Sequence, residues 1–361
     1  MIPFFPGFLP IRCILYRMSS PQSKIHFVDA FPAFNEVELC LFRIRYLRNV
    51  VNHFVIAESS ISHSGKPKEL VFQNWFRERE HEFPDVTIIH VNLEGLTDSW
   101  SREIYTREYL QDYIYSAYLK SNFIISDLDE IPSRSQVEAM AGREEYVHFS
   151  TPTYYRKLNL RLTDGHSAWS RGVMGHTSLV QLPNGGRFTK LPLLTGVDHG
   201  AHFSYLVRDN KGFDAKLEGF AHVELNQPVL KTKAFLKFVD DFQVDHLGRL
   251  NEIGNGLLEF IPKEKLNDLQ RRLFEMFPDF AVESKTQFSR KQRLLASFIV
   301  TMIVNQPKKA QDLSNFFISK QFSLYFLAKI FPCLLSGMLS FLTSISKRKV
   351  KLLKSQYISV Q

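Results

Sequence analysis

The feature that most constrains this chain is an alternation of short apolar segments with longer helix-forming segments over residues 24–132. The apolar segments are residues 25–28, 54–57, 86–91 and 123–126. A first helix is expected to begin at Asn35, a favourable N-cap residue, and a long helix is expected over residues 102–120. Strands that alternate with helices require crossover connections, so the pattern predicts an α/β fold with a mainly parallel sheet.

Acidic residues follow three of the four predicted strands: Asp29, Glu58 and Asp127. The last of these lies in the run 124–132, where Asp129 follows after one residue. Ligands of open α/β sheets bind at the carboxyl ends of the strands. Two carboxylates at such an end can converge on Mn²⁺ or Mg²⁺, which prefer oxygen ligands and bridge substrate phosphates. The run therefore predicts a divalent metal site at Asp127 and Asp129, and the alternative is an acidic turn that caps the next helix.

A basic excess points to anionic partners. Lysine and arginine outnumber aspartate and glutamate by 45 to 37, which gives a net charge of +8. Arg107 follows Glu103 by four residues, so it fits either an exposed ion pair on a helix or a contact with phosphate. Lys66 lies in a polar loop and is either a solvated charge or an anion contact. His202 is either a metal ligand or a histidine with a structural role.

Composition excludes two other classes of protein. Hydrophobic residues make up 44% of the chain and charged residues 23%, which is ordinary globular usage and excludes wholesale disorder. The three cysteines, Cys13, Cys40 and Cys333, are too far apart in sequence to indicate a disulfide or zinc framework.

Three parts of the chain are expected from these patterns. Residues 1–23 form a short N-terminal extension, residues 24–260 the main α/β domain, and residues 261–361 a basic and apolar helical tail. The N-terminal extension is apolar but broken by prolines, which fits neither a secretory signal nor a membrane span.

The tail leaves three arrangements open. Residues 322–345 are mostly apolar, and residues 347–354 contain five basic side chains. The segment can form helices that pack on the main domain, or an in-plane anchor with its lysines toward anionic lipid headgroups. A true membrane span would have to accommodate Lys329 and Pro332.

Several ordered blocks match one known family. They are residues 29–32 with Asn35 and Glu36, residues 54–59, residues 65–68, Trp100 with Glu103 and Arg107, residues 126–132, residues 202–206 and residues 220–226. In this order and spacing they resemble glycosyltransferase family 17 over about residues 24–230. The chain departs from the family pattern at Leu41 and Ala201.

The resemblance implies a GT-A type fold with a Rossmann-like nucleotide-sugar domain, and a metal-dependent, inverting glycosyltransferase. It implies a UDP-N-acetylglucosamine donor and a glycan or lipid-linked glycan acceptor. It also implies a role for each candidate residue: Asp127 and Asp129 hold the metal, Arg107 and Lys66 contact the diphosphate, His202 completes the metal shell or touches the phosphates, and Asp29 and Glu58 contact the nucleoside or shape its pocket.

Inversion by direct displacement needs a general base that takes the proton of the acceptor hydroxyl. Glu224 is the first candidate because it lies in a block that matches the family, and Asp198 is the second.

Two rival functions are compatible with the same residues. A metal-dependent phosphodiesterase or nucleotidyltransferase would use the same aspartates. A non-catalytic, basic, membrane-associated adaptor would use the tail. Nucleic acid is not expected as a partner, because the basic residues cluster in the tail instead of alternating with aromatic residues. The sequence favours a cytoplasmic protein at the inner face of a membrane, and it leaves the donor sugar, acceptor, linkage and oligomeric state open.

Overall fold

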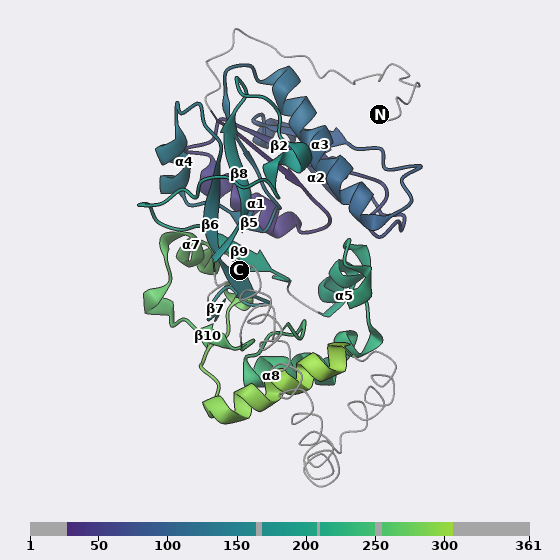
Figure 1. Cartoon of the computed structure of the whole chain (residues 1–361), viewed down its shortest axis with the longest axis vertical. Helices are drawn as coiled ribbons and strands as arrows, with labels where there is room; N and C mark the ends of the chain where they lie inside the picture. The colour runs from purple at the N-terminus through teal and green to yellow at the C-terminus, as the bar shows by residue number, and fades with distance from the viewer. Residues whose placement is uncertain (1–26, 164–167, 208–209, 250–254, 306–361) are drawn as a thin grey trace, which may run out of the picture.

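A ten-stranded mixed sheet forms the centre of the protein, and helices cover both of its faces (Figure 1). The computed structural model describes residues 27–163, 168–207, 210–249 and 255–305. The expected N-terminal extension and residues 306–361 of the expected tail lie outside the described residues.

The first part of the chain alternates strands with helices as the sequence predicts. Its elements are β1 (Phe27–Pro32), α1 (Val37–Leu47), β2 (His53–Glu58), α2 (Val71–Arg77), η1 (Glu80–Glu82), β3 (Val86–His90), α3 (Ser99–Ala117) and β4 (Asn122–Ile125). These four strands are parallel, in the order β3-β2-β1-β4. Asp29 of β1 is level with Phe54 of β2 and Ile124 of β4, so the strand ends meet at one edge.

The later strands are mostly antiparallel, which corrects the expectation of a mainly parallel sheet. They lie in the run β5 (Glu130–Ile131), α4 (Arg134–Met140), β6 (Val147–Tyr155), β7 (Leu160–Leu162), β8 (Ala168–His176), η2 (Pro183–Gly186), β9 (Ala201–Ser204) and, after α5 and α6, β10 (Leu258–Phe260). Strand β8 runs antiparallel to both β4 and β6, and β7 runs antiparallel to β6 and β10. The physical reason is connectivity: β6 and β7 are joined by a short turn, which favours antiparallel pairing, whereas parallel neighbours need a crossover.

Two helix starts differ from the expected positions. Helix α1 begins at Val37 with Glu36 at the N-cap position, so Asn35 is not the N-cap residue. Helix α3 begins at Ser99, three residues before the expected start, because the side chain of Asp98 accepts a hydrogen bond from the Ser101 amide at 2.8 Å.

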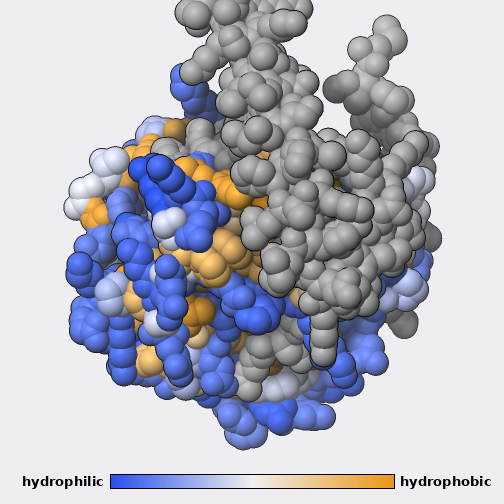
Figure 2. All heavy atoms as spheres, turned by 90° about the horizontal axis from the view of Figure 1, so that it is seen from below, coloured by the Kyte–Doolittle hydropathy of each residue, from blue (hydrophilic) through white to orange (hydrophobic). Residues whose placement is uncertain are grey.

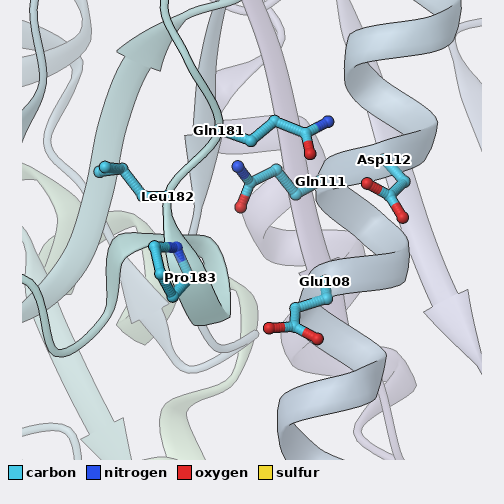
Figure 3. Close-up of a pocket in the computed structure, with 6 residues that line it drawn as sticks. All are labelled: Glu108, Gln111, Asp112, Gln181, Leu182 and Pro183. Atoms are coloured by element: carbon cyan, nitrogen blue, oxygen red, sulfur yellow. The ribbon is translucent and has the colours of Figure 1, made fainter. Parts of the chain in front are cut away.

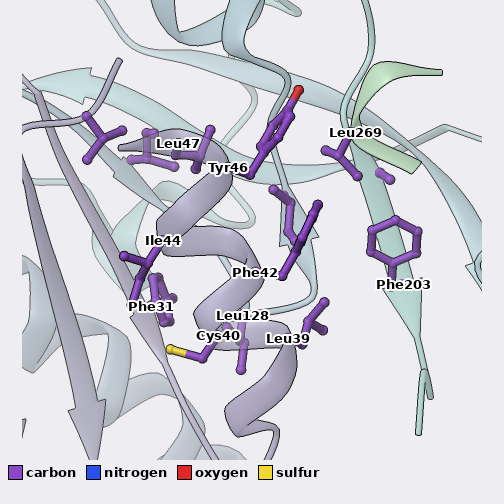
Figure 4. Packing of buried hydrophobic residues seen from close by; sticks show 14 of the residues in the cluster. Phe31, Leu39, Cys40, Phe42, Ile44, Tyr46, Leu47, Leu128, Phe203 and Leu269 are labelled. Carbon is purple, nitrogen blue, oxygen red and sulfur yellow. The ribbon is translucent and has the colours of Figure 1, made fainter. Parts of the chain in front are cut away.

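The parallel strands are apolar on both faces because both faces are covered. Phe31, Phe54 and Ile124 pack against α1 and α2, and this cluster includes Phe42 and Tyr46 of α1 (Figure 4). The alternate residues, such as Ala30 and Val55, pack against α3 on the opposite face. The sheet is therefore a buried layer, and only its edge is available to ligands.

The remaining helices extend the structure beyond the sheet. They are α5 (Asn210–Gly219), η3 (Val223–Leu225), η4 (Pro228–Lys231), α6 (Lys233–Phe242), η5 (Lys263–Lys265), α7 (Asp268–Met276), η6 (Pro278–Phe280) and α8 (Arg290–Asn305). Helices α5, α6 and α8 enclose a second core, in which Phe235 of α6 and Val300 of α8 are fully buried.

After the expected domain boundary at residue 260, helix α7 packs into the main hydrophobic core. Leu269 and Leu273 of α7 are buried in the same cluster as α1. Helix α8 packs against α6, and the lower face of the molecule carries hydrophobic side chains beside hydrophilic ones (Figure 2). Among the described residues, no helix has both the length and the apolar character needed to cross a membrane. The apolar segment 322–345 lies outside these residues.

Candidate active site

The candidate site is built around the acidic loop, residues 126–131, which follows β4. One buried guanidinium holds its backbone: Nη1 of Arg43 donates to the carbonyl oxygens of Asp127 at 2.7 Å and of Leu128 and Glu130 at 3.2 Å. Nη2 of Arg43 also donates to Ser126 Oγ at 2.8 Å. The conformation of the loop is therefore fixed from inside the protein, which leaves its carboxylates available for other contacts.

Asp29 neutralises this guanidinium. Its two carboxylate oxygens accept hydrogen bonds from Arg43 at 2.6 and 2.8 Å, and both side chains are fully buried. The predicted strand end at Asp29 is wrong, because β1 continues to Pro32 and the carboxylate of Asp29 is directed to Arg43 in the interior. Sequence reasoning missed Arg43, although a charged residue between Phe42 and Ile44 on the buried face of a helix is an unusual signal.

Asp127 lies between two arginines. Its Oδ1 is 2.5 Å from Nη2 of Arg107, and its Oδ2 is 2.8 Å from Nη2 of Arg187. Burial alone would raise the pKa of Asp127, but the two guanidinium groups outweigh burial and hold this pKa well below its usual range. Asp127 is therefore ionised at neutral pH. Arg107 also pairs with Glu103 at 2.7 Å, as the four-residue spacing predicts, but Arg107 is buried and not exposed in this pair, and its contact with phosphate stays a prediction.

Arg187 is a site residue that the sequence analysis did not select. It follows η2 and pairs with Glu130 at 3.1 Å as well as with Asp127. Asn184, Gly185 and Gly186 before it all have positive φ, which forms a tight turn that directs the arginine back to the acidic loop. The Asn-Gly-Gly turn followed by an arginine is the signal that was available in the sequence.

Asp129 is held by a lysine from a distant helix. Nζ of Lys216, on α5, is 2.9 Å from Asp129 Oδ2 and 3.1 Å from Glu36 Oε1. Burial would lower the pKa of Lys216, but the two carboxylates outweigh it and raise this pKa above its usual range. His202, on β9, brings Nε2 to 3.7 Å from Asp129 Oδ1. Sequence reasoning predicted His202 near the site but not Lys216.

We refer to Arg107, Arg187 and Lys216 as the cation triad. All three are at least nine-tenths buried, and each contacts a carboxylate of the acidic loop. They come from α3, the turn after η2, and α5, so three separate segments close around the end of β4.

The remaining donor-site candidates have other partners. Glu58 is buried and accepts hydrogen bonds from the amides of Phe72 and Gln73 at the start of α2, and Lys68 pairs with it at 3.2 Å. Lys66 is half-exposed and pairs with Glu218 of α5 at 3.1 Å. The structure thus brings Arg107, Asp127, Asp129 and His202 together and places Asp29, Glu58 and Lys66 in contacts around them.

The two base candidates lie on the surface. Glu224, on η3, pairs with His222 Nδ1 at 2.7 Å, and the ring of His222 meets Trp100 edge to face. Asp198 is exposed, and its carbonyl oxygen accepts a hydrogen bond from Ser133 Oγ at 2.6 Å.

The sequence predicts a metal at Asp127 and Asp129, but both oxygens of Asp127 are paired with Arg107 and Arg187, which leaves Asp129 and His202 as the candidate donors. Among the described residues, no group of three or more histidine, cysteine, aspartate or glutamate side chains is arranged to hold a metal ion. Asp129 Oδ1 and His202 Nε2 are 3.7 Å apart, which is a separation that two ligands of one ion can adopt. Mn²⁺ and Mg²⁺ keep several waters and bind through one or two protein carboxylates plus substrate phosphates, so this small donor set fits them.

The fold and the site together define an α/β protein with an acidic strand-end loop enclosed by buried cations. The family model for glycosyltransferase family 17 matches residues 10–240, which is 231 of 361 residues. The chain therefore belongs to glycosyltransferase family 17, which confirms the resemblance drawn from its sequence blocks.

Curated relatives match a shorter segment. The chain is 31% identical over 119 residues to the β-1,4-mannosyl-glycoprotein 4-β-N-acetylglucosaminyltransferases of Homo sapiens and Rattus norvegicus. The match covers 30% of this chain and 22% of each relative. Among solved structures, the inositol-1-phosphate CTP transferase from T. maritima matches 44% of this chain and 73% of its own at 9% identity, with a TM-score of 0.29.

Proposed function

We propose that this chain transfers N-acetylglucosamine from UDP-N-acetylglucosamine to a hydroxyl of a glycan or lipid-linked glycan. The observation that carries the proposal is the family match, because it spans the acidic loop and the family's class is glycosyl transfer. The choice of sugar is supported by the relatives, which are N-acetylglucosaminyltransferases. We further propose a GT-A type fold, supported by four parallel strands with the acidic loop directly after β4.

The cation triad supports a diphosphate site. Arg107, Arg187 and Lys216 are buried cations at the carboxyl end of parallel strands, where nucleotides bind in such sheets. Arginine presents paired donors that suit phosphate oxygens, and lysine presents a compact charge. A UDP-sugar held here would direct its leaving phosphate toward these three side chains.

The charge balance supports a metal requirement. The three cations contact five carboxylates, Glu36, Glu103, Asp127, Asp129 and Glu130, so the formal charge of the group is 3 − 5 = −2. A diphosphate would add further negative charge to a buried region, which is unfavourable without a counterion. Asp129 and His202 would hold Mn²⁺ or Mg²⁺, and the bound ion would neutralise charge on the departing diphosphate.

We propose Glu224 as the general base for an inverting displacement and Asp198 as its alternative. Glu224 pairs with His222, whose ring meets Trp100 in the first turn of α3, and Ser99 Oγ of this turn donates to the carbonyl of Ala221 at 2.8 Å. Replacement of Glu224 by Gln is expected to leave donor binding intact and to reduce kcat by about 10²–10⁴, the usual range for loss of a general base. Reduced donor affinity with unchanged kcat would instead place Glu224 in the nucleotide site.

A panel of nucleotide sugars tests the proposed activity. The purified full-length chain is incubated with each donor, with and without Mn²⁺, and both UDP release and the thermal midpoint are measured. A transferase releases UDP and transfers the sugar, and a bound donor raises the midpoint by mass action. Cleavage or formation of a phosphodiester, without sugar transfer, would favour the rival phosphodiesterase or nucleotidyltransferase. Lack of any response to metal and donor would favour the adaptor.

We also propose that the chain associates peripherally with the cytoplasmic face of a membrane. The support is the apolar segment 322–345 next to five basic side chains within residues 347–354. Binding of the full-length chain to anionic liposomes at low salt, weakened at high salt, is the expected result. Equal recovery in the soluble fraction with and without liposomes would contradict it.

A further inference from the structure

A small pocket lies between α3 and the segment that leads into η2. It has a volume of about 270 Å³ and is lined by Glu108, Gln111 and Asp112 on one side and by Gln181, Leu182 and Pro183 on the other. The polar side chains of the two walls converge on the space between them (Figure 3). The volume is just below the usual range of small-molecule sites, so a single ring is a suitable occupant.

The α3 wall of this pocket contains a buried hydrogen-bond acceptor that has no partner among the described residues. Gln111 is only 3% exposed, and its Oε1 has no hydrogen-bond partner among the described residues. The Oδ1 of Asn184, in the adjoining turn, is also buried without a partner within the described part of the chain. A buried acceptor that lacks a donor is costly, so a ligand that donates hydrogen bonds would relieve this cost.

The turn at residues 184–185, beside the pocket, packs closely against α3 and β4. The backbone amide of Asn184 donates to Glu108 Oε1 at 3.3 Å. A Cβ atom on Gly185 would lie 3.2 Å from Ile125 Cγ2 and 3.8 Å from Gln111 Oε1, and Gly185 has a positive φ that favours glycine. The wall formed by residues 181–183 is therefore held in position through the contacts of this turn with α3.

The chemistry of the lining selects one class of ligand. Two carboxylates and an unpartnered amide oxygen repel phosphate and other anions, and they attract hydroxyl or ammonium donors. A metal ion is not favoured, because no cluster of three ligating side chains exists among the described residues. Leu182 and Pro183 add an apolar surface that suits the C–H face of a sugar ring.

The pocket is close to the acidic loop. Gln111 follows Arg107 by four residues, and both side chains are buried on the same face of α3, about 6 Å apart along the helix axis. Arg107 reaches Asp127 from one side, and Arg187, four residues after Pro183, reaches it from the other. A ring in the pocket would therefore lie about one helical turn from the proposed diphosphate site.

We propose that this pocket binds one neutral pyranose ring of the acceptor glycan, with its hydroxyl groups donating to Asp112 and to Oε1 of Gln111. The proposal rests on the proposed function, because it assigns to the pocket the acceptor of that reaction. In this proposal Gln111 and Asp112 bind the acceptor, and the cation triad binds the donor.

Saturation-transfer NMR on the full-length chain tests the binding directly. The probe is methyl β-D-mannopyranoside, and the variants are Gln111→Leu and Asp112→Asn, with Glu275→Gln as a matched control on the exposed face of α7. Wild type and control are expected to bind the sugar, and each pocket variant to weaken binding about tenfold, the scale of one lost charge-assisted hydrogen bond. The variants are also expected to raise the acceptor KM about tenfold in the transfer assay, whereas Glu275→Gln keeps the KM of wild type.

Three results would overturn the assignment. Sugar binding that is equal in wild type, Gln111→Leu and Asp112→Asn would place the sugar elsewhere, and absence of binding to wild type would remove the site. Displacement of the sugar by propylammonium at equal concentration would identify an amine pocket. Failure of the proposed function is recognised separately, because wild type would then release no UDP from any donor while the NMR result with the sugar stands on its own.

Discussion

Two pairs of strand-end carboxylates look alike in the sequence and differ in the structure. Asp29 lies within β1 and Glu58 is the last residue of β2, and their oxygens accept hydrogen bonds from Arg43 and from the start of α2. Asp127 and Asp129 follow β4, and their oxygens are engaged by the cation triad. The first pair contacts groups within the fold, namely the buried guanidinium of Arg43 and the backbone amides at the start of α2. The second pair contacts cations suited to phosphate, so strand-end position alone does not distinguish structural acids from functional ones.

The strongest test of this comparison removes a structural acid. Replacement of Asp29 by Ala leaves the guanidinium of Arg43 buried without its carboxylate, and we expect the free energy of unfolding to fall by about 3–5 kcal/mol. Denaturation by urea, followed by circular dichroism, measures the change. The double variant with Asp29→Leu and Arg43→Met should recover much of the stability but not activity, because the loop carbonyls lose their donor. A single variant as stable as wild type would show that Arg43 does not depend on Asp29.

The complementary test removes a functional acid. Replacement of Asp129 by Ala is expected to reduce kcat at least about 100-fold, on the scale of losing one electrostatic contact in an active site. The free energy of unfolding should fall by less than in Asp29→Ala, about 1–2 kcal/mol, because the buried Lys216 keeps Glu36 as a compensating carboxylate. UDP release and urea denaturation of the same preparation give both numbers. A loss of stability as large as that of Asp29→Ala, with unchanged turnover, would reverse the roles of the two acids.

The smallest expected effect concerns pH. His63 hydrogen-bonds to Thr106, and burial lowers its pKa from 6.5 to about 4. The unfolded chain therefore binds a proton at higher pH than the folded chain, so stability is full above pH 6.5 and is lost as the pH falls toward 4. Because His63 is partly exposed, we expect its protonation to lower the free energy of unfolding by at most about 2 kcal/mol. Urea denaturation between pH 4 and 7 should show a shallower slope for His63→Gln than for wild type, and equal slopes would contradict this assignment.

The sequence predicted the first four strands, the acidic loop and the approach of Arg107 and His202 to it. These features depend on local patterns: apolar runs, helix spacing and short motifs. Lys216 and Arg43 could not be predicted as partners, because Lys216 is 87 residues from Asp129 and Arg43 is 84 residues from Asp127. The antiparallel strands were missed for a similar reason, since pairing between distant segments is decided by turns and packing instead of by local periodicity.

The single guanidinium of Arg43 has a consequence for how sequences of this kind can diverge. It joins the side chain of Asp29, the hydroxyl of Ser126 and three carbonyl oxygens of the acidic loop. A lysine could not replace it, because an ammonium has three donors and no fork to meet two carboxylate oxygens at once. The side chains at positions 29, 43 and 126 therefore depend on one another. A viable change at any of these positions should be accompanied by a change at the others.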